Sequence, residues 1–252
     1  MDTLVCIKRV PETGARTVLT DDKQRIDTSN LGFTISPHEE CGIEAAVQLA
    51  EAHDGTATAM TIGPEDAAEQ LRTAVAMGVD GPVLLETGDA EWRPSRVADA
   101  LATAIDDHDT DFDLLLFGNE SADEQNYQVG VRVAEALGVP CVTGIKGLTV
   151  TDGGVVAERE IPGGVERYEL DLPAVVSVKE GLNEPRYPSM RAKMRARKTD
   201  ITRREPDGEA VGGFEKVALE VPETDDSTAE ILGESPEAAE DVVDVLDELE
   251  VL

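Results

Sequence analysis

The stretch TATAMTIGPEDAAEQLRTAVAMGVDGPVLLE, residues Thr56–Glu86, contains the pattern that decides the fold. An apolar run over Thr56–Ile62 predicts a buried strand. The segment Pro64–Met77 follows with apolar residues at helical spacing. Its first proline and its early acidic residues are typical of a helix N-terminus, and Gly78 is typical of a helix end. A second strand is expected at Val83–Glu86, so this stretch predicts one strand–helix–strand unit.

The same alternation extends in both directions from this unit. Strands are expected at Leu4–Ile7 and Asp113–Phe117, and helices at Glu39–Ala52, Pro94–Asp106 and Gln125–Leu137. Such alternation predicts an α/β fold with a doubly wound, mostly parallel, Rossmann-like sheet that has helices on both faces. Ligands of these sheets bind beyond the carboxyl ends of the strands, where the strand order reverses.

Two later segments differ in character from this first part. Residues 149–178 contain short β-rich runs around paired glycines, which predict antiparallel strands added to the sheet edge. From Pro206 onward the chain has sixteen acidic residues and one basic residue, Lys216. We therefore expect a nucleotide-binding-type α/β domain over 1–205 and an acidic C-terminal arm over 206–252. Val242, Leu246 and Leu249 recur at helical spacing and predict a terminal helix that packs on the domain or on a partner.

The charge balance argues against some classes of binding partner. The chain has 53 acidic and 22 basic residues and a formal net charge of −31, which disfavours binding to nucleic acid or to an anionic membrane. Dense surface carboxylates also favour an origin in a high-salt cytoplasm. No apolar run approaches the ~20 residues that span a bilayer. The three cysteines, Cys6, Cys41 and Cys141, show no metal-type spacing and are expected to be reduced.

No catalytic motif is evident in the sequence. The three histidines, His38, His53 and His108, are scattered, and HExxH, P-loop and GxGxxG patterns are absent. A redox role would therefore require a cofactor, because no set of side chains here transfers electrons alone. The sequence predicts a protein that is not an enzyme in its own right.

Several motifs resemble one known family. They are VCIKRVPET at Val5–Thr13, SPHEECGIEAAVQL at Ser36–Leu49, IGPEDAAEQLRTAVAMGVD at Ile62–Asp80, GNESADEQNYQVG at Gly118–Gly130, and the segment Glu158–Ser189 with its LPAVV and NEPRY elements. In this combination and spacing they resemble the beta subunits of electron-transfer flavoproteins, including the Fix-type members. The resemblance covers essentially all of residues 1–205.

This resemblance implies a heterodimer and a nucleotide site. Family beta subunits pair with an alpha subunit that holds most of the contacts to the electron-carrying FAD. Their own site holds AMP in simple carriers and a second FAD in bifurcating and Fix-type members. Carried over by position, the site residues are Cys6, Ser36, Pro37, His38, Glu39, Ile62, Gly63, Gly118, Ser121, Asp123, Tyr127, Gln128, Val129 and Gly130.

Some of these positions depart from the family pattern or have a simpler interpretation. Ser36 stands where the family usually has Asn, and Tyr127–Val129 differs from the Asn-Gln-Thr of simple carriers, which weakens the AMP assignment without establishing FAD. Cys6 suits a small buried strand residue equally well. Asp123 and Glu124 can cap the following helix, and His38 can be an ordinary residue at a helix start.

The resemblance also implies a docking segment after NEPRY. In the family, a recognition loop at this position inserts an apolar residue into the electron-donating flavin dehydrogenase, and electrons pass on to a quinone oxidoreductase-type acceptor. Met190 takes that position here, followed by Arg191, Lys193 and Arg195. A solvated helix face is the simpler interpretation of this basic run.

An ATP-binding or ATP-hydrolysing protein of the same architecture is the alternative. Such a pyrophosphatase should carry an SGGxDS loop after the first strand, whereas KRVPET follows the strand here. Fold alone does not decide between the two.

Overall fold

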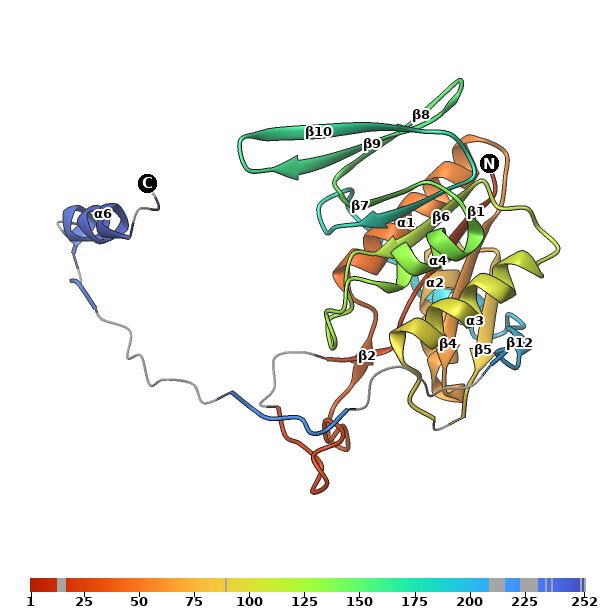
Figure 1. Cartoon of the computed structure of the whole chain (residues 1–252), viewed down its shortest axis with the longest axis horizontal. Coiled ribbons are helices and arrows are strands. Elements are labelled where there is room, and N and C mark those ends of the chain that lie inside the picture. The colour runs from red at the N-terminus through yellow and green to blue at the C-terminus, as the bar shows by residue number, and fades with distance from the viewer. Residues whose placement is uncertain are drawn as a thin grey trace. The chain divides into compact units, whose positions relative to one another are not determined.

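A seven-stranded parallel sheet forms the centre of the computed structural model, which describes residues 1–12, 17–88, 90–208, 216–222, 231–233, 235–236, 238–249 and 251. The strand order is β12-β5-β4-β1-β6-β11-β7, and every neighbouring pair is parallel. The bounds are β12 Thr202–Arg204, β5 Gly81–Glu86, β4 Ala57–Gly63, β1 Thr3–Cys6, β6 Leu114–Gly118, β11 Ala174–Val178 and β7 Cys141–Ile145. The predicted parallel α/β fold is confirmed (Figure 1).

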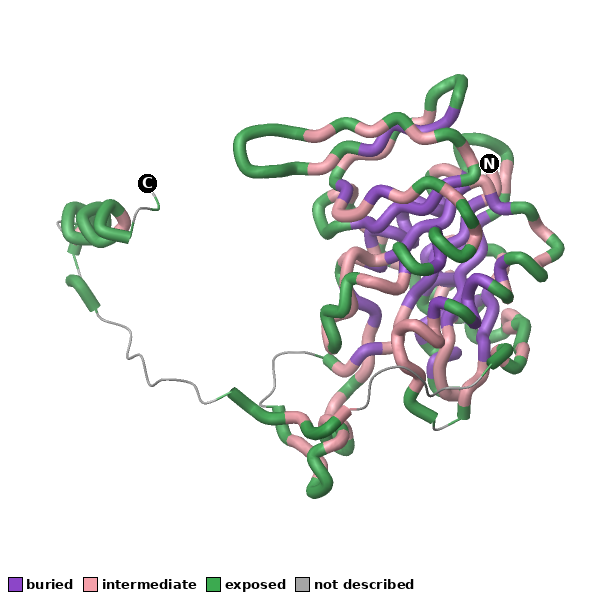
Figure 2. The backbone as a smooth tube through the Cα atoms, viewed as in Figure 1, coloured by how far each residue is buried: buried purple, intermediate pink, exposed green. Residues whose placement is uncertain are grey.

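Helices cover both faces of this sheet. One face packs against α1 (Pro37–Ala52) and α2 (Ala68–Met77), and the other against α3 (Pro94–Asp106) and α4 (Val129–Leu137). Because strand side chains alternate, the apolar runs supply both cores, and the central strands are buried throughout (Figure 2). The chain moves outward from β1 through β4 and β5 and returns over the second face to β6. The strand order therefore reverses between β1 and β6.

The structure corrects the start of one predicted helix. The helix expected from Gln125 begins at Val129, and residues 125–128 belong to the loop after β6. Gln125 and Tyr127 have positive φ angles of 50° and 55°, which a helix does not accommodate. Pro64, expected at the first helical position, instead precedes a single 3₁₀ turn, η1 (Glu65–Ala67), that leads into α2.

The antiparallel strands form sheets of their own. Strands β8 (Gly147–Thr151), β9 (Gly154–Ile161) and β10 (Gly164–Leu170) make a three-stranded sheet, and β2 (Val10–Pro11) pairs with β3 (Phe33–Thr34). Ala174–Val178, also within the β-rich segment, enters the main sheet as the parallel strand β11 between β6 and β7. Its five buried residues explain this interior position.

The segment that contains NEPRY runs along α1. The Asn183 side chain donates to the backbone oxygen of Cys41 at 2.9 Å, near the start of the helix. Further along, the Arg186 backbone N–H and Nε donate to Glu44 Oε2 at 3.0 and 2.9 Å, and Arg186 Nη1 donates to Glu51 at 2.9 Å. Although burial raises it, these hydrogen bonds and one from Gln48 hold the pKa of Glu44 below its usual value. Arg186 thereby satisfies a carboxylate that is almost fully buried.

The chain then enters α5 (Met190–Ala196), which packs on α2. Ala192 and Ala196 contact Val75 and Ala76, and the Ser189 hydroxyl accepts from the Ala192 N–H at 3.2 Å to cap the helix. The basic run thus includes a short helix with one buried face.

Two compact units are distinguished in the chain: residues 1–16 with 27–217, and residues 17–26 with 218–252. The second unit contains α6 (Ala238–Glu248), the predicted terminal helix, which has no buried residue. Thr13, the last residue of the opening motif, lies outside the described residues, as does much of 206–252. The predicted domain boundary at residue 206 remains a prediction.

Arg186→Ala should lower the free energy of unfolding by about 3 kcal/mol, because it leaves the buried Glu44 carboxylate without its cation. Chemical denaturation near neutral pH measures this loss. Glu51→Gln is the matched control, since it removes only the exposed partner of Arg186 and should cost less than about 1 kcal/mol. Equal effects of the two variants would contradict a stabilising role for the buried pair.

Candidate functional site at the carboxyl end of the sheet

Three of the expected site segments meet where the strand order reverses. Cys6, at the end of β1, lies in register with Met60 of β4 and Phe117 of β6. Strand β4 ends one residue beyond Ile62, at Gly63, and β6 ends at Gly118. The loops after β1, β4 and β6 therefore leave the sheet side by side.

Cys6 is a core residue in this structure. Its side chain is almost fully buried and packs with Met60 and Phe117 on the α3–α4 face. Burial raises the pKa of the Cys6 thiol above its usual range, so the group stays protonated and unreactive. A contact between Cys6 and a ligand would therefore involve its backbone.

Helix α1 begins with the expected segment Ser36–Glu39. Ser36 is the N-cap, Pro37 occupies the first turn and is exposed, and the backbone N–H of Ser36 donates to the Glu39 carboxylate at 3.3 Å. This contact is one half of a capping box, because the Ser36 hydroxyl itself is buried and has no hydrogen-bond partner among the described residues.

The Glu39 carboxyl lies buried against β6. A Cβ added at Gly118 would lie 2.6 Å from Glu39 Cγ, so only glycine allows α1 to approach the end of β6 this closely. Burial raises the pKa of Glu39 to about 8, against the opposing effect of hydrogen bonds from the backbone N–H groups of Lys8 and Ser36. Glu39 thereby links the loops after β1 and β6 to the start of α1.

His38 is held between two other loops. Its Nδ1 accepts from the backbone N–H of Glu180 at 2.7 Å, so the neutral ring carries its proton on Nε2. Nε2 lies 3.2 Å from Glu120 Oε1 and can donate to it. The second oxygen of Glu120 is buried and has no hydrogen-bond partner among the described residues, so it remains able to accept a donor.

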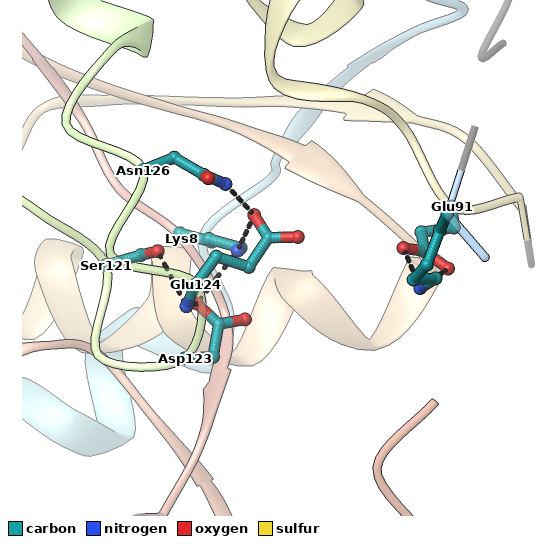
Figure 3. Close-up of polar contacts among 7 residues, drawn as sticks. Lys8, Glu91, Ser121, Asp123, Glu124 and Asn126 are labelled. Atoms are coloured by element: carbon teal, nitrogen blue, oxygen red, sulfur yellow. Dashed lines mark hydrogen bonds and ion pairs between the residues drawn. The ribbon is translucent and has the colours of Figure 1, made fainter. Parts of the chain in front are cut away.

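Lys8 connects the loop after β1 to the loop after β6, between which the strand order reverses. Its ammonium group lies 2.9 Å from Asp123 and 2.9 Å from Glu124, both in the loop after β6 (Figure 3). Although burial favours the neutral amine, these two carboxylates hold the pKa of Lys8 above its usual value. Glu124 also accepts from Asn126, and its backbone N–H lies 3.4 Å from the Ser121 hydroxyl. Lys8 thus fixes this loop against the end of β1.

The rest of the loop leads into α4. Tyr127 is more than half exposed, Gln128 is the N-cap without a side-chain capping bond, and Val129 is the first helical residue. Gly130 is buried, and a Cβ there would lie 3.1 Å from the Phe117 ring and 3.2 Å from Ser177 Oγ. The glycine therefore serves close packing of α4 on the sheet.

Sequence reasoning missed three residues of this site, namely Lys8, Glu120 and Glu180. Lys8 had a usable signal, because it follows the first strand directly. The contact of Glu120 with His38, and that of the Glu180 backbone N–H with the same ring, depend on how loops distant in sequence meet, which no local pattern indicates. Among the described residues, no group of three or more His, Cys, Asp or Glu side chains is arranged to hold a metal ion.

The expected docking residues lie elsewhere, on α5. Met190 is three-quarters exposed, and Arg191, Lys193 and Arg195 belong to the same short helix. Lys193 Nζ lies 4.6 Å from the centre of the Tyr187 ring. These residues lie on α5 and not in the loops that follow β1, β4 and β6. No helix among the described residues has the length and apolar character needed to cross a bilayer.

This architecture places the chain in the class of doubly wound α/β proteins that bind ligands where the strand order reverses. The family model for the electron transfer flavoprotein domain matches residues 25–208. The electron transfer flavoprotein subunit beta of Bacillus subtilis (strain 168) is 39% identical over 207 residues, which cover 82% of this chain and 80% of the relative.

Two further relatives carry the same description. The protein of Syntrophomonas wolfei is 37% identical over 201 residues, with 79% and 77% coverage, and that of Dictyostelium discoideum is 32% identical over 199 residues, with 79% and 78% coverage. The chain belongs to the electron transfer flavoprotein family and is of the beta-subunit type.

Glu39→Gln should stabilise the protein increasingly as pH rises from about 4.5 to about 8. The folded-state pKa of Glu39 is about 8, above its unfolded value of 4.5. Across this window the carboxyl ionises in the unfolded chain while it stays protonated in the fold, so the wild type loses stability as pH rises. The neutral amide avoids that loss and can still accept from Ser36. The two pKa values correspond to a gain of roughly 4 kcal/mol at pH 8, with little difference at pH 4. Denaturation curves at the two pH values measure it, and a variant that is less stable at both would contradict a buried, protonated Glu39.

Proposed function

We propose that this chain is the beta subunit of a heterodimeric electron-transfer flavoprotein. It would accept electrons from flavin dehydrogenases of the acyl-CoA dehydrogenase type and pass them to a quinone-reducing or other acceptor. The observation that carries this proposal is the family match over residues 25–208, a range that contains six of the seven strands of the main sheet, the loops after β4 and β6, and α5. In this function the chain is a carrier subunit with no catalysis of its own.

The proposed cofactors are FAD, held mainly by the alpha subunit, and AMP or a second FAD in the site of this chain. Flavin supplies the reversible electron uptake. The residues at the end of the sheet fit an anionic nucleotide. The Lys8 ammonium and the backbone N–H groups at the start of α4, which lack a side-chain cap, suit a phosphate. The buried free oxygen of Glu120 suits a hydroxyl donor such as a ribose, and the backbone at Cys6 and Ile62 suits a base.

Lys8 determines how a phosphate would bind there. Its two carboxylate partners already neutralise it, so a phosphate would take the place of Asp123 or Glu124. Directly after Asp123 and Glu124 in the chain, Gln125 and Tyr127 have positive φ angles, which give the loop a defined backbone turn. These features support the assignment of the loop Gly118–Gly130 as the phosphate-binding part of the site.

The proposed partners are an alpha subunit, flavin dehydrogenases and a quinone oxidoreductase-type acceptor. The second unit supports the alpha subunit as a partner, because it exposes apolar side chains. Val242 and Val245 lie on α6, a helix with no buried residue, and Leu249 follows directly after it. The α5 surface around Met190 supports the second. The chain has 53 acidic and 22 basic residues, and this excess of acidic residues supports the proposal that the protein functions in a high-salt cytoplasm.

Co-expression with an electron-transfer flavoprotein alpha subunit tests the function directly. The expected product is a yellow heterodimer that accepts electrons from a purified acyl-CoA dehydrogenase. Heat-released nucleotides, counted by chromatography, should be one FAD with one AMP, or two FAD. A chain that saturates with flavin by itself, or that hydrolyses ATP, would contradict the proposal.

Deletion of residues 234–252 should weaken association with the alpha subunit. Each apolar side chain of α6 contributes on the order of 1.5–3 kcal/mol at most when buried. Sedimentation equilibrium measures the association, and circular dichroism checks that the rest of the chain remains folded. Asp244→Asn is the control on the same helix, because it changes charge without removing apolar area. Unchanged association of the truncated chain would assign α6 another role.

A further inference from the structure

Helix α1 buries two glutamates whose partners differ. Glu39 is 5% exposed and Glu44 is 3% exposed. Arg186 donates to both carboxylate oxygens of Glu44, so that carboxylate has its counter-charge inside the fold. Glu39 forms no ion pair with any described residue, and its carboxyl accepts hydrogen bonds from the backbone N–H groups of Ser36 and Lys8. A buried carboxyl without a cation favours its protonated form, because nothing beside it balances the charge of the ionised form.

Glu39 is connected in two ways to the loop that we propose binds phosphate. Its Cγ lies so close to Gly118, where β6 ends and this loop begins, that no Cβ fits at that position. Its second connection is the backbone of Lys8, whose ammonium group lies 2.9 Å from Asp123 and 2.9 Å from Glu124 in the loop (Figure 3). A charge on Glu39 therefore acts on the position that a phosphate would occupy.

The elements packed against Glu39 bring other ionisable groups to the same region. These groups are Cys6 and Lys8 from β1 and its loop, Glu120, Asp123 and Glu124 from the loop after β6, and His38 and Glu40 from α1. Burial raises the pKa of the Cys6 thiol above its usual range, so the thiol stays protonated. Although burial opposes it, the carboxylates of the loop hold the pKa of Lys8 above its usual value. Burial and Glu180 also raise the pKa of Glu40, which therefore needs a control of its own.

We propose that nucleotide binding at the end of the sheet is coupled to the protonation of Glu39: the neutral carboxyl admits the phosphate of an adenine nucleotide, and the carboxylate opposes it. This inference rests on the proposed function and specifies how the site of that function is regulated. The proton that Glu39 takes up when the phosphate binds comes from the solvent, and no other bond is made or broken.

The direction of the coupling follows from the charges. Above about pH 7 a phosphate monoester carries about two negative charges, against one on the carboxylate that it displaces from Lys8. This added negative charge makes ionisation of Glu39 less favourable, so its pKa in the complex lies above the value of about 8 in the free site. By linkage, the nucleotide binds with full affinity below about pH 8 and more weakly as pH rises above it.

A phosphate site made only of a lysine and backbone N–H groups would behave differently. The pKa of Lys8 lies above its usual value, so its ammonium group keeps its charge between about pH 7 and about pH 9. Backbone N–H groups do not titrate in this range. A fall in affinity between these two pH values therefore distinguishes a site controlled by Glu39 from a site that depends on Lys8 alone.

The test uses the intact heterodimer, freed of the nucleotide of this site, with AMP and FAD as alternative probes. For whichever probe binds, isothermal titration calorimetry should show a wild-type Kd at least about fivefold higher at pH 9 than at pH 7. At about pH 8, titrations in two buffers of different ionisation enthalpy should show uptake of a fraction of a proton for each nucleotide bound. Glu39→Gln should bind equally at both pH values and take up no proton. Glu40→Gln, the control on the same helical turn, should keep the wild-type pH dependence.

The possible failures have different meanings. A wild-type Kd that stays constant or decreases as pH rises would overturn the coupling, and this measurement needs no variant. A Glu39→Gln heterodimer that keeps the wild-type dependence, or that binds no nucleotide at pH 7, would also overturn it. Loss of the dependence in Glu40→Gln would assign the proton to Glu40 instead. A wild-type heterodimer that binds neither AMP nor FAD at either pH would contradict the nucleotide site of the proposed function and, with it, this inference.

Discussion

The ion pair between Arg186 and the buried carboxylate of Glu44 is the interaction on which the arrangement of the first unit depends. A charge in that position is tolerable only because one guanidinium supplies donors to both of its oxygens. The same guanidinium belongs to the segment that leads to α5. Stabilising Glu44 therefore also fixes the path of the chain between β11 and α5, which ends in the packing of α5 on α2.

Helix α1 connects the two surfaces for which we propose functions. At its first turn, His38 and Glu39 contact the loops that leave the sheet, through Glu120, Glu180 and the end of β6. Further along, Glu44 and Glu51 hold Arg186. One rigid element thus positions the candidate nucleotide site at one end and, through the segment 180–186, the base of the docking helix. Helix α1 and the segment 180–186 both lie within residues 25–208, the range that matches the family.

The sequence predicted those elements of the fold whose burial shows in the pattern of apolar residues. Asp113–Phe117 is a continuous apolar run after its first residue, Thr56–Ile62 intersperses threonines with apolar residues, and both predicted strands are found in the centre of the sheet. Cys141–Ile145 was missed because its alternating, partly exposed residues give a weak signal. The start of α4 was predicted too early, because Gln125 and Tyr127 adopt left-handed backbone conformations that their residue types do not indicate. The positions of the site segments followed from the rule on strand ends. Their pairings did not, since Lys8 and Asp123 are 115 residues apart and meet only once the sheet has formed.

The double pairing of Lys8 has a consequence for the selectivity of the site. An anion that arrives there does not meet a bare cation; it must exchange with carboxylates already bound to it. Asp123 and Glu124, in the loop after β6, thus compete with any incoming anion for the Lys8 ammonium group. Weakly held monovalent anions cannot displace two tethered carboxylates that are always present at high local concentration. A phosphate that also gains the N–H groups of a helix start has the additional contacts to do so. If the proposed phosphate site is correct, these carboxylates would keep the position clear of simple ions in a high-salt medium.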